Sequence, residues 1–296
     1  MIAKPFFIVI VTALLSLTSA EMLGADDFSR DSATPTELTI PQPITGTDHL
    51  YRYVVDILKM ALEVTAPKYG PVTIFAVGGA ALQSTQLRDL EQRQLDITWS
   101  VTSLQREKRH QAVYVPLTNG LFGKRVLMVR SGEARFHEIK DEDALKEFRY
   151  IQGHDWPDAH IFRANGYRVV ESSYTGAFTM LSAGFVDAFP RGVLEIHQEL
   201  AEREKENFSV EPQILFEYPS ALLFFVPKNR KMLAVRLEEG LKHLYGTGKL
   251  QHHLVQQPFY QTALKTMENR TVIQLSNPLL SKKTTHALET FNFSDK

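Results

Sequence analysis

Apolar residues along this chain alternate between helical spacing and short continuous runs. In "TGTDHLYRYVVDILKMALEVTAP", Leu50, Val54, Leu58 and Leu62 lie at helical spacing, which predicts a helix that ends at Pro67. The runs "GPVTIFAV" and "DITWSV" predict strands on either side of the helix "LQSTQLRDLEQRQL". Strands and helices that alternate in this way indicate βα units on a mostly parallel sheet.

The same alternation starts again after "LTNGLFGK". It runs through the strands "GKRVLMVRS", "YIQG", "YRVVES" and "VDAF", with the helices "DEDALKEF", "PDAHIFRANG", "TGAFTMLSAG" and "VLEIHQELAEREK" between or after them. The strand "ALLFFVPKN" and the helix "RKMLAVRLEEGLKHLYGTG" then follow. Two such runs predict an α/β protein with two lobes.

The first twenty residues have the composition of an export signal. Lys4 gives a positive start, residues 6–17 an apolar stretch, and residues 18–20 a small-residue cleavage site. The apolar stretch is shorter than the ~20 residues that a membrane span needs. We therefore expect a cleaved signal peptide at residues 1–20, a flexible polar leader at 21–36, and a protein exported to the periplasm.

Cysteine and charge content narrow the function classes. The chain has no cysteine, which excludes disulfides, thiolate metal sites and cysteine nucleophiles. Its net charge is −1, which becomes −2 when the single charge of Lys4 is removed with the signal peptide. This near-neutral balance argues against a nucleic-acid partner, which favours a strongly basic face.

Three segments, taken in order, carry a resemblance to a known family. "YVVDILKMALE", "LEQRQLDITWSVTSLQREKR" and "VPKNRKMLAVRLEEGLKHLYGTGKL" resemble the type II periplasmic solute-binding proteins, in particular the extracellular amino-acid-binding branch (solute-binding family 3). The resemblance spans about residues 37–260. "GHDWPD" and "FPRG" depart from the well-studied amino-acid binders and are similar to a proteobacterial subgroup.

The resemblance implies two lobes joined by paired crossovers, with a ligand cleft that closes by hinge motion. The crossovers are expected near residues 121–124 and 218–222. Lobe 1 would then comprise residues 37–123 and 223–296, and residues 124–222 would form the inserted lobe 2.

The stretch Ser103-Leu104-Gln105-Arg106, which follows Thr102, matches the family's Thr-x-x-Arg motif with Ser in place of Thr. In that family the Arg grips a ligand carboxylate, because a guanidinium makes a planar two-bond fork with it. The resemblance therefore implies that Arg106, Ser103 and Thr102 bind ligand. The alternatives are a solvated helix charge for Arg106 and a helix cap for Ser103.

"QGHDWPD" places a strand end before a helix that starts near Pro157, a residue suited to the first helical position. Trp156 is a candidate cleft wall and His154 a candidate ligand contact. The alternatives are a packing aromatic and a loop histidine.

"GFVDAFPRGVLEI" matches the strand after which amino-acid binders carry the Asp that captures the ligand's ammonium group. That position falls on Gly192, and Arg191 stands beside it. Arg191 is therefore a candidate second clamp that would favour an anionic ligand; the alternative is a turn arginine that faces water. Trp99 and Tyr174 are weaker candidates for the cleft wall.

Together these features predict a monomeric periplasmic solute-binding protein, not an enzyme, that encloses a small polar, anionic or amino-acid-like ligand. An inner-membrane transporter (of the ABC type) or a sensor protein would read the closed form. No cofactor or metal is expected. Two other classes stay open: a dehydratase-like enzyme on the same fold, with His154 or Glu171 as acid or base, and a ligand-free interaction module.

Overall fold

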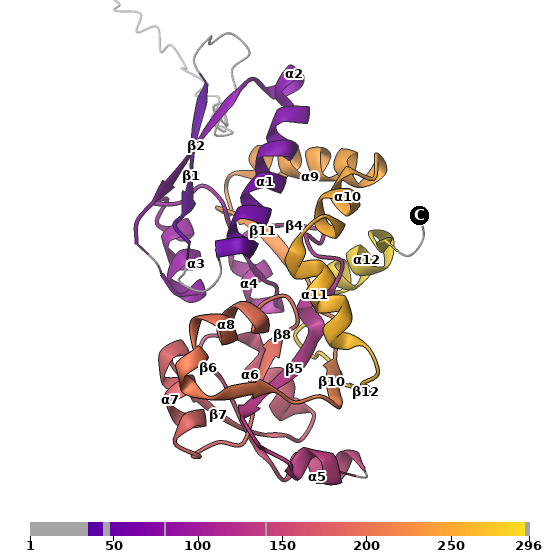
Figure 1. Cartoon of the computed structure of the whole chain (residues 1–296). Coiled ribbons are helices and arrows are strands. Elements are labelled where there is room, and N and C mark those ends of the chain that lie inside the picture. The colour runs from indigo at the N-terminus through magenta and orange to yellow at the C-terminus, as the bar shows by residue number, and fades with distance from the viewer. Residues whose placement is uncertain (1–34, 44–47, 80, 140, 294–296) are drawn as a thin grey trace, which may run out of the picture.

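The elements form an upper lobe, a lower lobe and a C-terminal segment that runs along both (Figure 1). The computed structural model describes residues 35–43, 48–79, 81–139 and 141–293. The expected signal peptide and most of the expected leader lie outside these residues. In the described part of the chain, no helix is both long and apolar enough to cross a membrane.

Lobe 1 is built from two segments of chain. Its elements are β1 (Thr36–Pro41), α1 (Asp48–Val64), α2 (Ala66–Tyr69), β2 (Val72–Val77), α3 (Gln83–Glu91), β3 (Thr98–Val101), α4 (Leu104–Arg109), β4 (Gln111–Val113), β11 (Leu222–Val226), α9 (Lys231–Gly246) and α10 (Lys249–Val255). β1 and β2 pair in parallel, whereas β11 lies antiparallel between β3 and β4. β11 runs the other way because the chain re-enters lobe 1 there from the opposite lobe.

Lobe 2 lies between the two crossovers. Its elements are the 3-10 helix η1 (Leu121–Gly123), β5 (Lys124–Arg130), η2 (Arg135–Glu138), α5 (Glu142–Lys146), β6 (Arg149–Gly153), α6 (Pro157–Ala164), β7 (Arg168–Ser172), α7 (Tyr174–Ser182), β8 (Phe189–Gly192), α8 (Ile196–Glu202), η3 (Glu204–Glu206), β9 (Phe208–Val210) and β10 (Ile214–Glu217). β6 and β7 are parallel, but β5 is antiparallel to β8, β9 and β10. The expected parallel pairing therefore holds for β1–β2 and β6–β7, whereas the strands that pair with β5 or β11 run antiparallel to them.

Residues 223–296 were expected to belong to lobe 1, but the last part of the chain contacts both lobes. We call residues 257–293 the C-terminal strap. It contains α11 (Pro258–Met267), β12 (Thr271–Gln274) and α12 (Lys282–Thr290). β12 pairs in parallel with β10, so this part of the strap extends the lobe-2 sheet. α12 returns toward lobe 1 (Figure 1).

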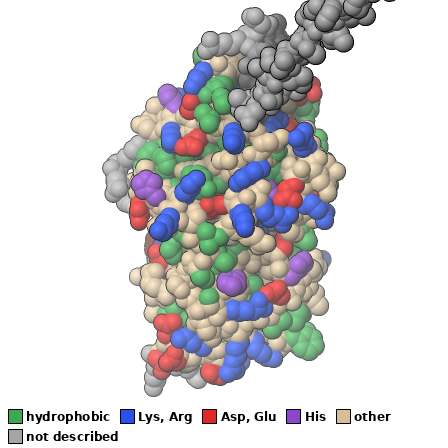
Figure 2. Space-filling view, turned by 180° about the vertical axis from the view of Figure 1, so that it is seen from behind, with side chains coloured by type: hydrophobic (Ala, Val, Ile, Leu, Met, Phe, Trp, Pro, Cys, Tyr) green, Lys and Arg blue, Asp and Glu red, His purple; other side chains and the backbone are tan. Residues whose placement is uncertain are grey.

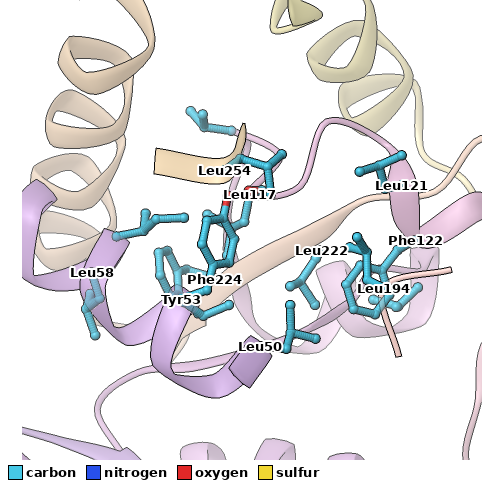
Figure 3. Close-up of a cluster of buried hydrophobic side chains, with 14 of the residues drawn as sticks. Leu50, Tyr53, Leu58, Leu117, Leu121, Phe122, Leu194, Leu222, Phe224 and Leu254 are labelled. Atoms are coloured by element: carbon cyan, nitrogen blue, oxygen red, sulfur yellow. Dashed lines mark hydrogen bonds between the residues drawn. The ribbon is translucent and has the colours of Figure 1, made fainter. Parts of the chain in front are cut away.

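One of the hydrophobic clusters among the described residues runs through the junction of the lobes. Tyr53 of α1 is 1 % exposed, and its hydroxyl donates to the Leu117 carbonyl over 2.6 Å. Leu194, which follows β8 in lobe 2, belongs to the same buried cluster as α1 and β11. Figure 3 shows Leu194 beside Phe122 and close to Leu222. Apolar packing therefore joins lobe 2 to lobe 1 beside the crossovers.

The stretch around Pro190 forms differently from the sequence expectation. "VDAF" was expected as the strand, with residues 190–192 as an interruption and a helix directly after them. In the structure β8 covers residues 189–192, with Arg191 opposite Val126 of β5, and α8 begins only at Ile196. The antiparallel partner β5 holds this Pro-containing segment in the sheet, and that partner is not visible in the local sequence.

Candidate functional site

A cavity of about 510 Å³ lies where α3 and α4 of lobe 1 face α6 of lobe 2. Both lobes and the strap contribute to its lining, which consists of Ser84, Leu87, Arg88, Ser103, Gln105, Arg106, Arg109, His110, His154, Asp155, Trp156, Pro157, His160 and Leu279. The lobes touch at its edge, because the Ser84 backbone N–H donates to Asp155 Oδ2 over 3.2 Å. The cavity therefore lies in the cleft that the two-lobed fold predicts.

Arg106 sits in the first turn of α4 and reaches across the cleft. Its Nη1 donates to Gln83 Oε1 at 3.0 Å, Ser100 Oγ at 2.5 Å and the Val101 carbonyl at 2.6 Å. Its Nη2 donates to the carbonyl of Asp155 in lobe 2 at 2.9 Å. The guanidinium of Arg106 therefore links the two lobes through four neutral oxygen acceptors.

Among the described residues, no carboxylate forms an ion pair with Arg106. The side chain is only 9 % exposed, and no described carboxylate lies within 4.0 Å of its guanidinium nitrogens. Burial lowers the pKa of Arg106 to about 10, although the more distant Asp155 and Asp158 oppose that effect. A desolvated cation bonded only to neutral groups favours an anion as its further partner.

Ser103 and Thr102 have structural partners beside Arg106. The Ser103 hydroxyl caps α4 by accepting from the Arg106 backbone N–H at 3.3 Å, and Ser103 also lines the cavity. The Thr102 hydroxyl is 1 % exposed and donates to Glu107 Oε1 at 2.7 Å. A direct contact of either residue with ligand stays a prediction; Thr102 in particular is turned to Glu107.

Trp156 and His154 both line the cavity from lobe 2. Trp156 immediately precedes α6, is half-buried, and stacks on Phe189 with ring centroids 6.1 Å apart and planes 12° apart. His154 is exposed, and its Nδ1 lies 3.1 Å from the Ser172 carbonyl. The structure thus places both residues in the cavity lining, and their contact with ligand stays a prediction.

The sequence hypothesis placed the Arg191 side chain in the cleft, but in the structure this side chain is buried within lobe 2. It is 3 % exposed, and it donates to Glu199 through Nε at 2.7 Å and Nη2 at 2.5 Å. Its guanidinium carbon also lies 4.6 Å from the Trp156 ring centroid. Glu199, on α8, is one turn beyond Glu195, so the fold provides this arginine with its own acids. A clamp role for Arg191 stays a prediction that would require it to leave Glu199.

Tyr174 belongs to the same lobe-2 network. Its hydroxyl donates to Glu199 Oε1 at 3.0 Å, and burial, followed by the charge of Glu199, raises its pKa. Trp99 lies on the lobe-1 side, where it packs against Tyr51 and, edge-on, against Phe224. Neither Tyr174 nor Trp99 lines the cavity described above, so both stay weaker candidates.

A second buried pairing in lobe 2 lies beside Arg191. Arg125 contacts Asp158 at 2.7 Å and Glu195 at 3.2 Å, and its Nε donates to the Tyr218 hydroxyl at 3.0 Å. Glu195 also lies 3.6 Å from Arg191. Lobe 2 thus neutralises both of its buried arginines internally.

Several residues in the cavity lining or in contact with Arg106 had no local sequence signal. Gln83 and Asp155 bind Arg106, and His110, His160 and Arg88 extend the lining. Three guanidiniums and three imidazoles therefore surround the cavity with one carboxylate, and Arg109 is paired outside the lining with Glu91 at 2.8 Å. Figure 2, seen from behind, shows Lys and Arg side chains spread over the lobe-1 half.

Few described side chains could serve as a catalytic acid or base or as metal ligands. Glu171, one of the two acid–base candidates, pairs with Arg163. Within the described ranges, no group of three or more His, Asp or Glu side chains is placed to hold a metal ion.

Comparison with solved structures identifies the fold. An ancestral arginine-binding protein bound to arginine matches with a TM-score of 0.55 at 14 % identity, over 76 % of this chain and 99 % of that one. A histidine kinase sensor domain with similarity to periplasmic binding proteins matches with a TM-score of 0.56 at 16 % identity, over 77 % and 98 %.

A third structure is the GluR0 ligand-binding core from Nostoc punctiforme in complex with L-glutamate. It matches with a TM-score of 0.53 at 14 % identity, over 76 % of this chain and all of that one. No protein-family model and no curated protein matches the chain. The chain thus has the two-lobed fold of periplasmic amino-acid-binding proteins, and about a quarter of it has no counterpart in these structures.

Proposed function

We propose that this protein is an exported solute-binding protein that holds a small anionic solute between its lobes. The solute would carry a carboxylate or phosphate group, and Arg106 would be its main charged contact. Trp156 would form a wall of the site, with Arg88 and the cavity histidines on its rim. The fold supports the solute-binding role, and the charge of the cavity supports the anionic class.

The observation that carries this proposal is the unbalanced charge of Arg106. A buried guanidinium whose bonds all go to neutral oxygens has lost hydration without gaining a counterion. An anionic solute would supply that counterion. A guanidinium is also suited to the task, because it can present two parallel N–H donors to a carboxylate or phosphate.

The acidic residues of lobe 2 favour a solute without an ammonium group, that is, an acid rather than an amino acid. At the position where the resembling amino-acid binders carry an ammonium-binding Asp, this chain has Gly192. The nearby carboxylates of Glu195, Glu199 and Asp158 are already paired with Arg125 or Arg191. Among the described lobe-2 acids that line the cavity, only Asp155 is left for an ammonium group, and its Oδ2 already accepts from the Ser84 backbone N–H.

The partner that recognises the closed, solute-bound conformation would be a membrane protein. The resemblance implies either an uptake transporter or a sensor, and one structural neighbour is itself a sensor domain of a histidine kinase. Export fits the signal-like start of the chain. Both partners would act through the same step, which is recognition of the solute-bound arrangement of the lobes.

A thermal-unfolding screen of the exported form tests this function. The panel contains mono-, di- and tricarboxylates, inorganic phosphate, phosphate esters, amino acids, sugars and polyamines. A solute at 1,000 times its dissociation constant should add roughly 4 kcal/mol, and each kcal/mol shifts the midpoint by about 2–4 °C at this chain length. We expect large shifts only with carboxylates or phosphates.

The Arg106→Met variant is the matched control, and it should lose those shifts. A shift confined to sugars or polyamines would contradict the anionic site. No shift with any compound, in protein freed of co-purified solute, would contradict solute binding and favour the interaction-module alternative.

A further inference from the structure

The C-terminal strap contacts both sides of the cavity within a few residues. Beyond β12, the Ser276 backbone N–H donates to Asn165 Oδ1 at 2.9 Å, and Asn165 Nδ2 donates back to the Ser276 carbonyl at 2.8 Å. Asn165 caps the C-terminal end of α6 in lobe 2. Three residues later, the Leu279 carbonyl accepts from the Leu104 backbone N–H at 2.8 Å, at the start of α4 in lobe 1.

Chain length makes this pair of contacts a tether. Three peptide steps separate Ser276 from Leu279, and an extended chain spans at most about 3.6 Å per step, or roughly 11 Å in all. Pro278 further limits the conformations of the link. While both ends stay bonded, the end of α6 and the start of α4 cannot move farther apart than this span plus the hydrogen-bonded contacts at its two ends. These two helices form opposite walls of the cavity.

The strap also holds the helix that carries Arg106. Thr284 of α12 is fully buried and donates to Glu107 Oε1 at 2.7 Å. The same oxygen accepts from Thr102, while Glu107 Oε2 accepts from the Tyr114 hydroxyl at 3.0 Å. Glu107 directly follows Arg106, so these bonds fix α4 just beyond its ligand-facing residue.

Two further contacts anchor the strap at the crossovers. Asn277 Nδ2 donates to the Pro219 carbonyl at 2.8 Å, and the Phe293 backbone N–H donates to Asn119 Oδ1 at 3.1 Å. Leu279 itself lines the cavity. The strap thus contacts both lobes, both crossovers and the site.

We propose that the C-terminal strap is a positioning element for the solute site and a stop on the opening of the cleft. Residues 276–279 limit the separation of α4 and α6, and Thr284 holds α4 through Glu107. Solute recognition would then occur within a restricted range of lobe motion rather than by free hinge opening. The affinity aspect of this proposal rests on the proposed function, whereas the limit on lobe motion does not.

An insertion can lengthen the tether at the expense of the bond from the Leu279 backbone N–H to Asn277 Oδ1, and it keeps the residues that contact the two lobes. Six residues, Gly-Ser-Gly-Ser-Gly-Ser, are inserted between Asn277 and Pro278. The matched control places the same six residues between Glu268 and Asn269, in the turn before β12, where the tether length is unchanged. Because the chain has no cysteine, Gln92→Cys on lobe 1 and Ala164→Cys on lobe 2 allow specific spin labelling of two exposed positions.

Double electron–electron resonance measures the distances between the lobes without solute. These distances test whether the strap limits the opening of the cleft. We expect the 277/278 insertion to broaden the distribution toward longer distances, while the 268/269 insertion matches the unmodified strap. Identical distributions for the two insertions would overturn the proposal.

Solute affinity tests the positioning role separately. For the strongest carboxylate or phosphate in the screen, the 277/278 insertion should weaken binding about tenfold or more, and the control insertion less than twofold. Equal affinities would overturn the positioning role. If none of these probes binds the unmodified protein, the proposed function fails, while the distance result still decides whether the strap limits opening.

Discussion

Two buried arginines, one on each side of the cleft, have opposite electrostatic surroundings. Arg191 in lobe 2 forms two bonds with the carboxylate of Glu199, which is itself fully buried. Arg106 in lobe 1 is also buried, yet its four bonds go to neutral oxygens. Residue type and burial alone do not separate the two. The difference lies in whether the fold supplies the counterion.

This difference assigns the arginines distinct roles. A cation with an internal acid stabilises the lobe that contains it, and an outside anion would have to compete with that acid. A buried cation without an internal carboxylate favours the binding of an anion from solution. Under the proposed function, recognition of the solute would therefore rest on Arg106 in lobe 1, while Arg191 lies against Trp156 in lobe 2.

The largest expected effect is on stability and comes from Arg191→Met. This change leaves the Glu199 carboxylate buried without its cation, which should lower the free energy of unfolding by about 3–5 kcal/mol. In contrast, Arg106→Met removes a charge that has no carboxylate partner but leaves neutral acceptors unpaired, and should lower it by about 1–3 kcal/mol. Urea unfolding of the two variants measures both values.

The double variant Arg191→Met/Glu199→Leu is the control, and it should recover much of the loss because both charges leave together. Equal losses for Arg191→Met and Arg106→Met would break the contrast between the two arginines.

A smaller effect is expected from Gly192→Ala, beside Arg191. A Cβ at this position would meet Glu195 Oε2 and would lie 2.8 Å from Arg125 Nη1, so the paired groups must shift. We expect a loss of about 1–3 kcal/mol, typical of overpacking.

Gly246→Ala is the matched control for Gly192→Ala. Gly246 has no atom within 4 Å of an added Cβ, and the change should be neutral or stabilising because Ala favours a helix. Differential scanning calorimetry compares the two variants, and a neutral Gly192→Ala would show that the lobe-2 network does not fill this space.

The smallest effect is a pH dependence on the lobe-1 side. Burial lowers the pKa of His110, with contributions from Arg109, Arg106 and Lys228, while Glu91 opposes the shift. The unfolded chain therefore binds this proton more readily than the folded one, and stability should fall as the pH is lowered through about 6.5.

One histidine can contribute at most about 1.4 kcal/mol per pH unit. His110→Gln should flatten the profile between pH 7 and 5.5. Part of the slope should remain, because burial also lowers the pKa of His197. An unchanged profile in the variant would exclude His110 as a source of the slope.

Local sequence patterns predicted many of the helices and strands and marked Arg106 as a candidate, but they did not predict the partners of the arginines. The helical spacing from Leu50 to Leu62 and the Thr-x-x-Arg motif are local features, and the structure contains the corresponding helices. Glu199, in contrast, meets Arg191 only because the chain turns after β8 and α8 folds back onto it. No spacing rule links a strand residue to a helix residue eight positions later.

The strap shows the same limit at longer range. "TVIQ" is a plausible strand, but its neighbour β10 lies 57 positions earlier at Ile214↔Thr271 (271 − 214 = 57). The bonds between Asn165 and Ser276 join residues 111 positions apart. Asn and Ser are common in loops, so nothing in their local sequence marks them as partners across the molecule.

Calorimetric titration of the strongest anionic solute from the screen tests the central claim most directly. It compares the unmodified protein, Arg106→Lys, Arg106→Met and the double variant Arg191→Met/Glu199→Leu. We predict that Arg106→Met abolishes binding, that Arg106→Lys binds poorly because an ammonium cannot form the planar fork, and that the double variant still binds. Unchanged affinity in Arg106→Met, with binding lost in the double variant, would instead place recognition of the solute on lobe 2.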